Sequence, residues 1–269
     1  MEPQRTPAVA NLFYPGSDPQ LRKELSGFIT RSQNPDSVLG AIVPHAGYVY
    51  SGAVAGAVFS QIQIPDSVII LGPNHRGIGA KIAVSAYGVW EMPMGSVPID
   101  SKLAENILKE CSSIVNDPQA HSVEHSIEVE VPFLQYLNSD VSIVPICVSH
   151  CSYETCQEIG TNLAKVIKAY DREVLLVAST DMTHYESQAI AKRNDQLAID
   201  QILALHPEGL YKTVEEHMIS MCGVIPTTIL LEACLVLGSK EARLIQYATS
   251  GDVSGDYSQV VGYAGLIVY

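Results

Sequence analysis

The sequence predicts an α/β protein in which helices cover both faces of one central sheet. Short apolar runs typical of buried strands alternate with longer, helix-like stretches along the 269 residues. The composition, 47% hydrophobic and 17% charged residues, suits a globular chain with a sizeable core. We find no internal repeat, low-complexity tract or long linker, so we expect a single domain over residues 1–269.

The N-terminal half of the chain is predicted to alternate between helices and strands. Ser17 follows the turn Phe13–Gly16 and is suited to cap the first helix. The stretch Tyr87–Pro98 contains the single Trp and two prolines, so we expect a loop there. The expected elements are helices over Asp18–Thr30, Ser51–Gln61 and Ser101–Cys111 and strands over Leu39–Val43, Ser67–Leu71 and Lys81–Ser85.

The C-terminal half continues the same alternation. Pro132 lies inside the helix expected over His121–Tyr136, so that helix is interrupted or begins late. Pro226 occupies a favourable first-turn position of another helix. The other expected elements are helices over Tyr153–Tyr170, Gln188–Leu205, Pro207–Met218 and Pro226–Leu237 and strands over Val141–Cys147, Val174–Ala178, Ala242–Ala248 and Gln259–Val268.

Charge and hydropathy exclude several classes of partner. Sixteen basic and twenty-nine acidic residues give a net charge of −13, and no Lys/Arg cluster is present, so we expect neither nucleic acid nor a membrane surface as partner. No apolar run approaches the roughly 20 residues that span a bilayer. The N-terminus lacks the pattern of a signal peptide, so we expect a cytoplasmic protein.

Three histidines each follow a predicted strand. His45 comes after Leu39–Val43, His75 after Ser67–Leu71, and His184 after Val174–Ala178. In open α/β sheets, ligands bind in the crevice outside the carboxyl ends of the strands. These three side chains therefore indicate a metal or acid/base site at that edge.

The first two of these histidines are the best candidates for metal ligands. Neutral imidazole is a common ligand of borderline metals, and the short Gly/Pro-containing loops would hold His45 and His75 firmly. Tyr48 and Asn74 stand close to them in sequence and are expected to line the same cleft. One such histidine alone could simply hydrogen-bond loop backbone, but two in equivalent positions favour a ligand pair.

Asp181 and His184 are expected to handle protons. They lie three residues apart in one loop, and a carboxylate beside an imidazole fixes its tautomer and raises its pKa. Asp181 would then orient His184, which would act as a general acid or base. The carboxylate of Asp181 could also cap the turn that follows.

The segment from His121 to His125 spells H-x-x-E-H, the inverted zincin pattern. On a helix, His121 and His125 would share a face and could bind zinc, with Glu124 as the base. No later acidic residue stands out as the third ligand that a peptidase needs. The alternative is that these three residues line a polar cleft.

Cys222 is the cysteine best suited to chemistry. It precedes Gly223 and a predicted helix, and a thiol at a helix N-terminus is expected to have a depressed pKa. It could equally be a small buried residue beside a turn. The Gly-rich segment 249–257 lacks the spacing of a phosphate-binding loop, so no nucleotide cofactor is expected.

Taken together, these motifs closely resemble the Memo family, called AmmeMemoRadiSam system protein B in prokaryotes, over essentially the whole chain. The resemblance implies the fold of LigB-like class III extradiol dioxygenases, here a three-layer α/β/α sandwich around a mixed central sheet. The matching segments are Phe13–Pro15, Pro44–Tyr48, Gly72–His75, His121 with Glu124–Glu128, Asp181 with Thr183–Tyr185, and Cys222–Gly223.

The resemblance also implies roles for individual residues. His45 and His75 match the two histidine ligands of the iron enzymes, and His184 matches their acid/base histidine. Cys222 falls where those enzymes carry a carboxylate ligand. A thiolate is softer than a carboxylate, so iron or copper, and also zinc, are the metals to consider.

Three functions follow as expectations. The first is a metal-dependent redox or oxygenase-type enzyme. The second is a non-catalytic module that binds metal, a small molecule or a peptide, since animal Memo proteins have been linked to phosphotyrosine peptides. The prokaryotic family name further suggests a radical-SAM protein and a second component of that system as partners. The third is the zinc peptidase of the H-x-x-E-H pattern.

Overall fold

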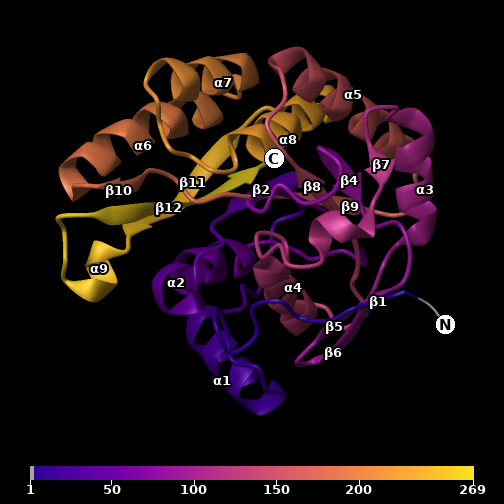
Figure 1. Ribbon diagram of the computed structural model, residues 1–269, viewed down its shortest axis with the longest axis horizontal. Helices are drawn as coiled ribbons and strands as arrows, with labels where there is room; N and C mark the ends of the chain where they lie inside the picture. Colours follow the sequence, from indigo (N-terminus) through magenta and orange to yellow (C-terminus); the bar gives the residue numbers. More distant parts are fainter. Residues whose placement is uncertain (1–2) are drawn as a thin grey trace.

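The computed structural model describes residues 3–269 and confirms the α/β/α sandwich with a mixed central sheet (Figure 1). The helices are α1 (Asp18–Phe28), α2 (Tyr48–Phe59), α3 (Ser101–Glu110), α4 (Val131–Leu137), α5 (Tyr153–Ala169), α6 (Gln188–Leu203), α7 (Pro207–Glu216), α8 (Val224–Leu237) and α9 (Gly251–Ser254), with 3-10 turns η1 (Pro118–His121) and η2 (Glu128–Glu130). None of the helices in this range combines the length and apolarity that crossing a bilayer requires.

The large sheet brings three loops of the predicted site to one edge. Within residues 3–269 its strands lie in the order β10-β12-β2-β9-β3-β8-β4-β7, with β11 paired to β12. Strands β2, β9, β3 and β8 run parallel, whereas β12 and β4 pair antiparallel with β2 and β8. The strands are β2 (Gly40–Val43), β3 (Ser67–Pro73), β4 (Ile82–Val84), β7 (Val115–Asn116), β8 (Ser142–Val148), β9 (Val174–Ser179), β10 (His184–Glu186), β11 (Ala242–Thr249) and β12 (Val260–Val268).

Each central strand sends alternate side chains into two different cores. In β3, Ile69 and Leu71 pack into the core formed with α3, α5 and α8. Val68 and Ile70 of the same strand pack into the core formed with α1, α2 and α4. Figure 1 shows α5 to α8 on one side of the sheet and α1, α2 and α4 on the other. Burial on both faces explains the continuous apolar runs in the sequence.

The prediction of a loop over Tyr87–Pro98 is wrong. The segment forms a hairpin of β5 (Val89–Met92) and β6 (Gly95–Pro98), and β5 pairs with β1 (Gln4–Arg5) in a small separate sheet. Trp90 and Met92, two residues apart, are both buried, and the residues before each of them are partly exposed. This alternation is typical of a strand, but the prolines of the segment favour a loop prediction. Gly95, at a φ of 114°, supplies the turn.

The helix expected over His121–Tyr136 begins late, as the position of Pro132 predicted, and the residues before Val131 are not α-helical. Only α4 is a regular helix, and Pro132 stands in its first turn, where a missing backbone N–H costs nothing. Upstream, the carboxylate of Glu124 accepts the backbone N–H groups of His125 and Ser126 at 2.9 and 3.0 Å. These local hydrogen bonds replace helical ones. The two histidines of H-x-x-E-H therefore do not share a helix face.

Candidate metal centre

Three histidines converge at the carboxyl edge of the sheet. The ligand nitrogens that His45, His75 and His125 can offer all lie within 4.8 Å of one another. His45 follows β2, His75 follows β3, and His125 lies in the loop between η1 and η2. Three imidazoles form a donor set suited to zinc, copper or iron. Sequence reasoning paired His45 with His75, and it assigned His125 either to the lining of the cleft or, with His121, to a separate zinc site.

The cluster is buried at one end and open at the other. His45 is 2% exposed, whereas the side chains of His125 and His75 are 15% and 30% exposed. The ring centroid of His75 lies 5.1 Å from that of His45 and 4.6 Å from that of His125. Of the three rings, that of His75 is therefore the most accessible.

His45 is held by residues that follow or end β9. Ser179, the last residue of β9, places its Oγ 2.7 Å from Nδ1 of His45, because β9 lies beside β2 in the sheet. Asp181 Oδ1 accepts the backbone N–H of His45 at 2.8 Å. The second ring nitrogen, Nε2, lies 3.2 Å from the Sγ of Cys222. With Nδ1 occupied, Nε2 is the atom left to bind a metal.

His75 is held by Glu124. The carboxylate Oε1 lies 2.9 Å from Nδ1 of His75, and Oε2 accepts the backbone N–H of the same residue at 2.7 Å. Burial of Glu124 raises its pKa, but the hydrogen bond and the charge of His75, the backbone N–H of Ser126 and the nearby His125 together outweigh that effect and lower the pKa to about 2. The carboxylate is therefore charged, and Nε2 of His75 remains free.

His125 carries an unsatisfied buried nitrogen. Its Nδ1 has no hydrogen-bond partner of acceptable geometry among residues 3–269, although Glu124 Oε1 is 3.3 Å away. Burial lowers the pKa of His125 to about 4. Burial and the neighbouring rings of His125 and His75 likewise lower the pKa of His45. Neutral imidazoles with free lone pairs are the form that binds metals, so these residues fit a transition-metal ion.

The depressed pKa expected for Cys222 is wrong. Burial, together with the nearby carboxylate of Asp181, raises the pKa of this thiol. The residue precedes the start of α8 and donates its backbone N–H to the carbonyl of Asp181 at 3.3 Å. Its sulfur still lies beside the cluster, next to Nε2 of His45. A metal bound there would have to displace the thiol proton.

His184 and Asp181 are not paired with each other in the way expected. Nδ1 of His184 lies 2.8 Å from the carbonyl oxygen of Ser220, so Nδ1 carries a proton in the neutral ring and Nε2 is free to accept one. The hydrogen bonds described for Asp181 go to the loop of His45 and to Cys222, not to His184. Burial raises the pKa of Asp181 to about 6.

The other residues predicted to line the cleft have supporting positions. His121 is 1% exposed, places Nε2 3.1 Å from the carbonyl of Ala83, and is not part of the three-histidine group. Tyr48 is buried, and its hydroxyl donates to the carbonyl of Val129 at 2.6 Å. Asn74 donates to the carbonyl of Ile78 at 2.9 Å and shapes the His75 loop.

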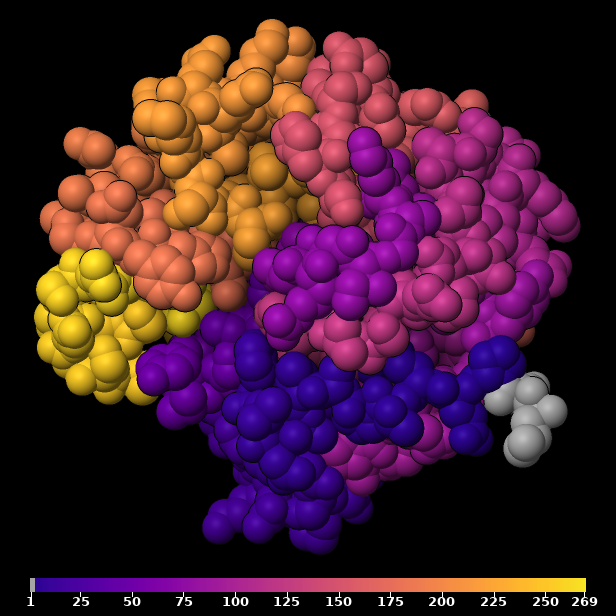
Figure 2. Space-filling model, viewed as in Figure 1, coloured from indigo at the N-terminus to yellow at the C-terminus, as the bar shows by residue number. Residues whose placement is uncertain are grey.

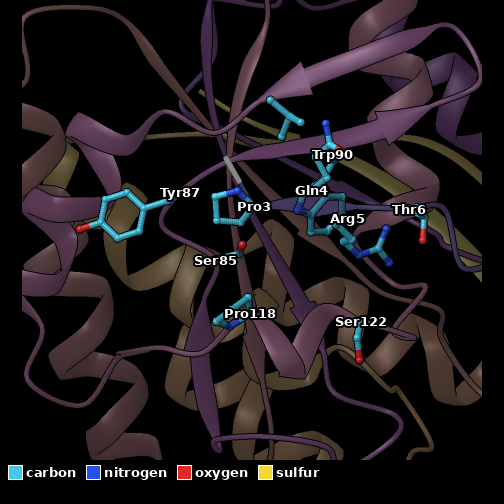
Figure 3. A pocket seen from close by; sticks show the side chains of 10 residues that line it. Pro3, Gln4, Arg5, Thr6, Ser85, Tyr87, Trp90, Pro118 and Ser122 are labelled. Carbon is cyan, nitrogen blue, oxygen red and sulfur yellow. The ribbon is translucent and has the colours of Figure 1, made fainter. Parts of the chain in front are cut away.

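The N-terminal segment braces the loop that carries Glu124, a contact that sequence reasoning missed. Arg5 lies over the ring of Trp90 at 4.1 Å and donates to the carbonyls of His121 and Glu124 at 2.7 and 2.8 Å. Figure 3 shows Arg5 and Trp90 at the wall of a cavity of about 180 Å³. Figure 2 shows the indigo N-terminal residues running across the surface beside magenta segments from the middle of the chain.

Comparisons with known proteins agree with this architecture. The family model for Memo-like proteins matches residues 5–267. MEMO1 family proteins of Methanopyrus kandleri and Methanocaldococcus jannaschii are 41% and 40% identical, each over 98% of both chains. The MEMO1 family protein of Aquifex aeolicus is 42% identical over the same share of both chains.

A solved structure supports the fold independently. An uncharacterized protein from Escherichia coli K12 matches 85% of this chain and 98% of its own, with a TM-score of 0.57 at 13% identity. At this low sequence identity, the match supports the fold of the chain and says nothing about its function. The family match and the 40–42% identical relatives, spread along nearly the whole length, show that the chain belongs to the Memo-like protein family.

Proposed function

We propose that the chain is a metal-dependent redox protein whose metal is held by His45, His75 and His125, with Cys222 as a further ligand. The observation that carries the proposal is the convergence of three imidazole nitrogens within 4.8 Å. It is supported by the partners on Nδ1 of His45 and His75, which leave Nε2 of both rings as the nitrogen that could bind a metal. Such outer hydrogen bonds orient histidine ligands in metalloproteins.

The proposed metal is iron or copper. Imidazole suits both, and a thiolate beside three imidazoles favours copper more than a carboxylate would. The ion would supply one-electron chemistry with dioxygen or a thiol. Around it, His184 can accept a proton at Nε2, and Asp181 keeps the His45 loop in place. The open side at His75 would admit a small molecule.

The ligand assignment is tested by anaerobic titration with Fe(II) and with Cu(I). Alanine variants of His45, His75, His125 and Cys222 are compared with wild type and with His217→Ala, which removes an exposed histidine that is not part of the three-histidine group. We expect each cluster variant to bind at least tenfold more weakly and the control to bind normally. Equal binding by all the proteins would rule out this site.

A second candidate function is a non-catalytic module that binds metal or a peptide together with protein partners. A wide hollow of about 580 Å³ adjoins the His45 loop and is lined by Phe13, Gly47 and Tyr50 among others. Leu12 and Val49 beside it are 77% and 64% exposed, which favours an apolar partner segment.

Oxygen uptake separates the two functions. The metal-loaded protein is assayed with a panel of catechols and thiols, and turnover that disappears in His45→Ala supports the enzyme. Binding without any turnover supports the module. Co-purification with a radical-SAM protein and the second component of that system tests the proposed partners.

A further inference from the structure

Ser179 lies at the centre of a group of hydrogen bonds. Counting the available protons shows which atom donates and which accepts in each of them. Its Oγ lies 2.7 Å from Nδ1 of His45, 2.6 Å from the carbonyl oxygen of Ser126 and 3.1 Å from Oε1 of Glu130. A serine hydroxyl has one proton and two lone pairs. The backbone carbonyl can only accept, so it receives the one proton of Ser179. The other two neighbours, His45 and Glu130, must then donate.

For Glu130 to donate, its carboxyl group must carry a proton. The residue is 0% exposed, and no described hydrogen bond or ion pair links it to a Lys or Arg, since Arg5 pairs with Glu128 instead. Its second oxygen, Oε2, has no hydrogen-bond partner among residues 3–269. A buried carboxylate in such surroundings would be very costly, whereas the neutral acid is not. Burial indeed raises the pKa of Glu130 well above its usual value, and Asp181 adds to the effect.

We propose that Glu130 is a positioning residue for the metal centre: as a neutral acid it donates to Ser179 and so holds His45 with its proton on Nδ1 and its lone pair on Nε2. This inference rests on the proposed metal function. Nε2 is the atom that lies beside Cys222, the further proposed ligand. If the donor at Glu130 is lost, the hydroxyl of Ser179 can turn toward His45 and donate to Nδ1. That arrangement moves the ring proton to Nε2, where it blocks the metal.

The protonation of Glu130 can be measured without any metal. We expect the infrared spectrum of the wild-type protein at neutral pH to contain a carbonyl band of a buried carboxylic acid that is missing from Glu130→Gln. Glu232→Gln is the control, because Glu232 is also buried but accepts a hydrogen bond from Tyr153 at 2.6 Å, far from the cluster in the fold. If Glu130→Gln removes no such band, the proposal is wrong.

The positioning role is tested with two substitutions of similar size. Glu130→Gln keeps an N–H donor for Ser179, whereas Glu130→Met removes it. Nitrogen-15 spectra of metal-free protein should show the Nδ1–H tautomer of His45 in wild type and Glu130→Gln, and a mixture in Glu130→Met. We expect the Fe(II) or Cu(I) affinity to fall by about 10–100-fold in Glu130→Met and to stay within about threefold of wild type in Glu130→Gln.

The possible results separate this proposal from the proposed function. Equal affinities of the Gln and Met variants, with an unchanged tautomer, would overturn the role of Glu130. If wild type binds neither metal, the proposed function fails, while the infrared band and the tautomer still decide whether Glu130 positions His45. Should Glu130→Met not fold, Ser179→Ala removes the same link and is expected to give the same mixture of tautomers.

Discussion

The carboxylate of Glu124 contacts His75 through both of its oxygens: Oε1 lies 2.9 Å from the ring Nδ1, and Oε2 accepts the backbone N–H of the same residue at 2.7 Å. The carboxylate thus fixes both the position of the loop and the rotation of the ring. Its Oε1 also accepts the backbone N–H of His125, the next candidate ligand. One buried charge therefore orders two sides of the three-histidine cluster.

Removing this carboxylate should weaken metal binding without removing a ligand. We expect Glu124→Ala to bind Fe(II) or Cu(I) about 10–100-fold more weakly than wild type, since partners of ligand histidines have effects of that size. Titration calorimetry under argon measures the change. The exposed Glu216→Ala serves as control and should bind normally. If Glu124→Ala bound metal with normal affinity, the contacts between Glu124 and His75 would not be needed for metal binding.

The ion pair of Arg5 and Glu128 should be important for stability. Glu128 is 0% exposed and Arg5 donates to it at 2.7 Å. We expect Arg5→Met to lower the free energy of unfolding by about 3–5 kcal/mol, because it leaves a buried carboxylate without its cation. Urea denaturation measures this. As a control, Arg22→Met breaks a pair with Asp18 that is about half exposed, and should cost less than about 1 kcal/mol. Similar costs for both variants would contradict the bracing role of Arg5.

Glu130 should make the stability depend on pH in an unusual direction. Its pKa in the folded protein is raised well above 4.5, so its contribution to stability is complete at low pH and is lost as the pH rises toward the folded pKa. Glu130→Gln has no such loss. The stability of the variant relative to wild type should therefore rise by about 1.4 kcal/mol per pH unit above pH 5, until the pH reaches the folded pKa of Glu130.

Urea denaturation at several values between about pH 5 and 8 measures this difference. Asp181 and Tyr48, the titratable groups that face Glu130, are present in both proteins, and their own titrations largely cancel in the comparison. A difference that stays constant with pH would mean that Glu130 is already ionised in the folded protein.

Two glycines should respond to the same substitution with opposite sign. A Cβ on Gly56 in α2 would lie 2.6 Å from both Cβ and the backbone oxygen of Phe28, where α1 ends. We expect Gly56→Ala to destabilise the protein by about 1–3 kcal/mol. A Cβ on Gly27 in α1 meets nothing within 4 Å, so Gly27→Ala should stabilise it by about 0.5 kcal/mol. Thermal unfolding of the pair checks the close contact of α1 and α2. Equal shifts in both variants would argue against it.

The sequence predicts what depends on local patterns. Buried strands such as β3 are visible as continuous apolar runs, and His45 and His75 are visible because they follow such runs. The hairpin around Trp90 is hidden, since its pairing with Arg5 joins segments far apart in the chain. Its prolines and Gly95 are residue types common in loops, which is why the sequence predicts a loop there. Gly95 instead serves the tight turn between β5 and β6.

The third histidine could not be assigned because its position depends on side-chain hydrogen bonds. The spacing of His121 and His125 favours a helix, but the hydrogen bonds that the backbone N–H groups of His125 and Ser126 donate to Glu124 override that preference. Likewise, nothing local reveals that Ser179 would meet both His45 and Glu130. A signal did exist in the sequence: the acidic residue immediately before His125 is one that a histidine cluster often needs as a partner.

The insertion of β9 between β2 and β3 has a consequence for biosynthesis. The two strands that lead to His45 and His75 leave the ribosome early, but they have no shared neighbour until residues 174–179 follow much later. Until then the edges of β2 and β3 that face β9 have no native partner, although the other edge of β3 can already pair with β8. Strand pairings between such distant segments form slowly. A nascent chain therefore cannot bring His45 and His75 together until residues 174–179 have been made, and loading with the proposed ion must wait until then.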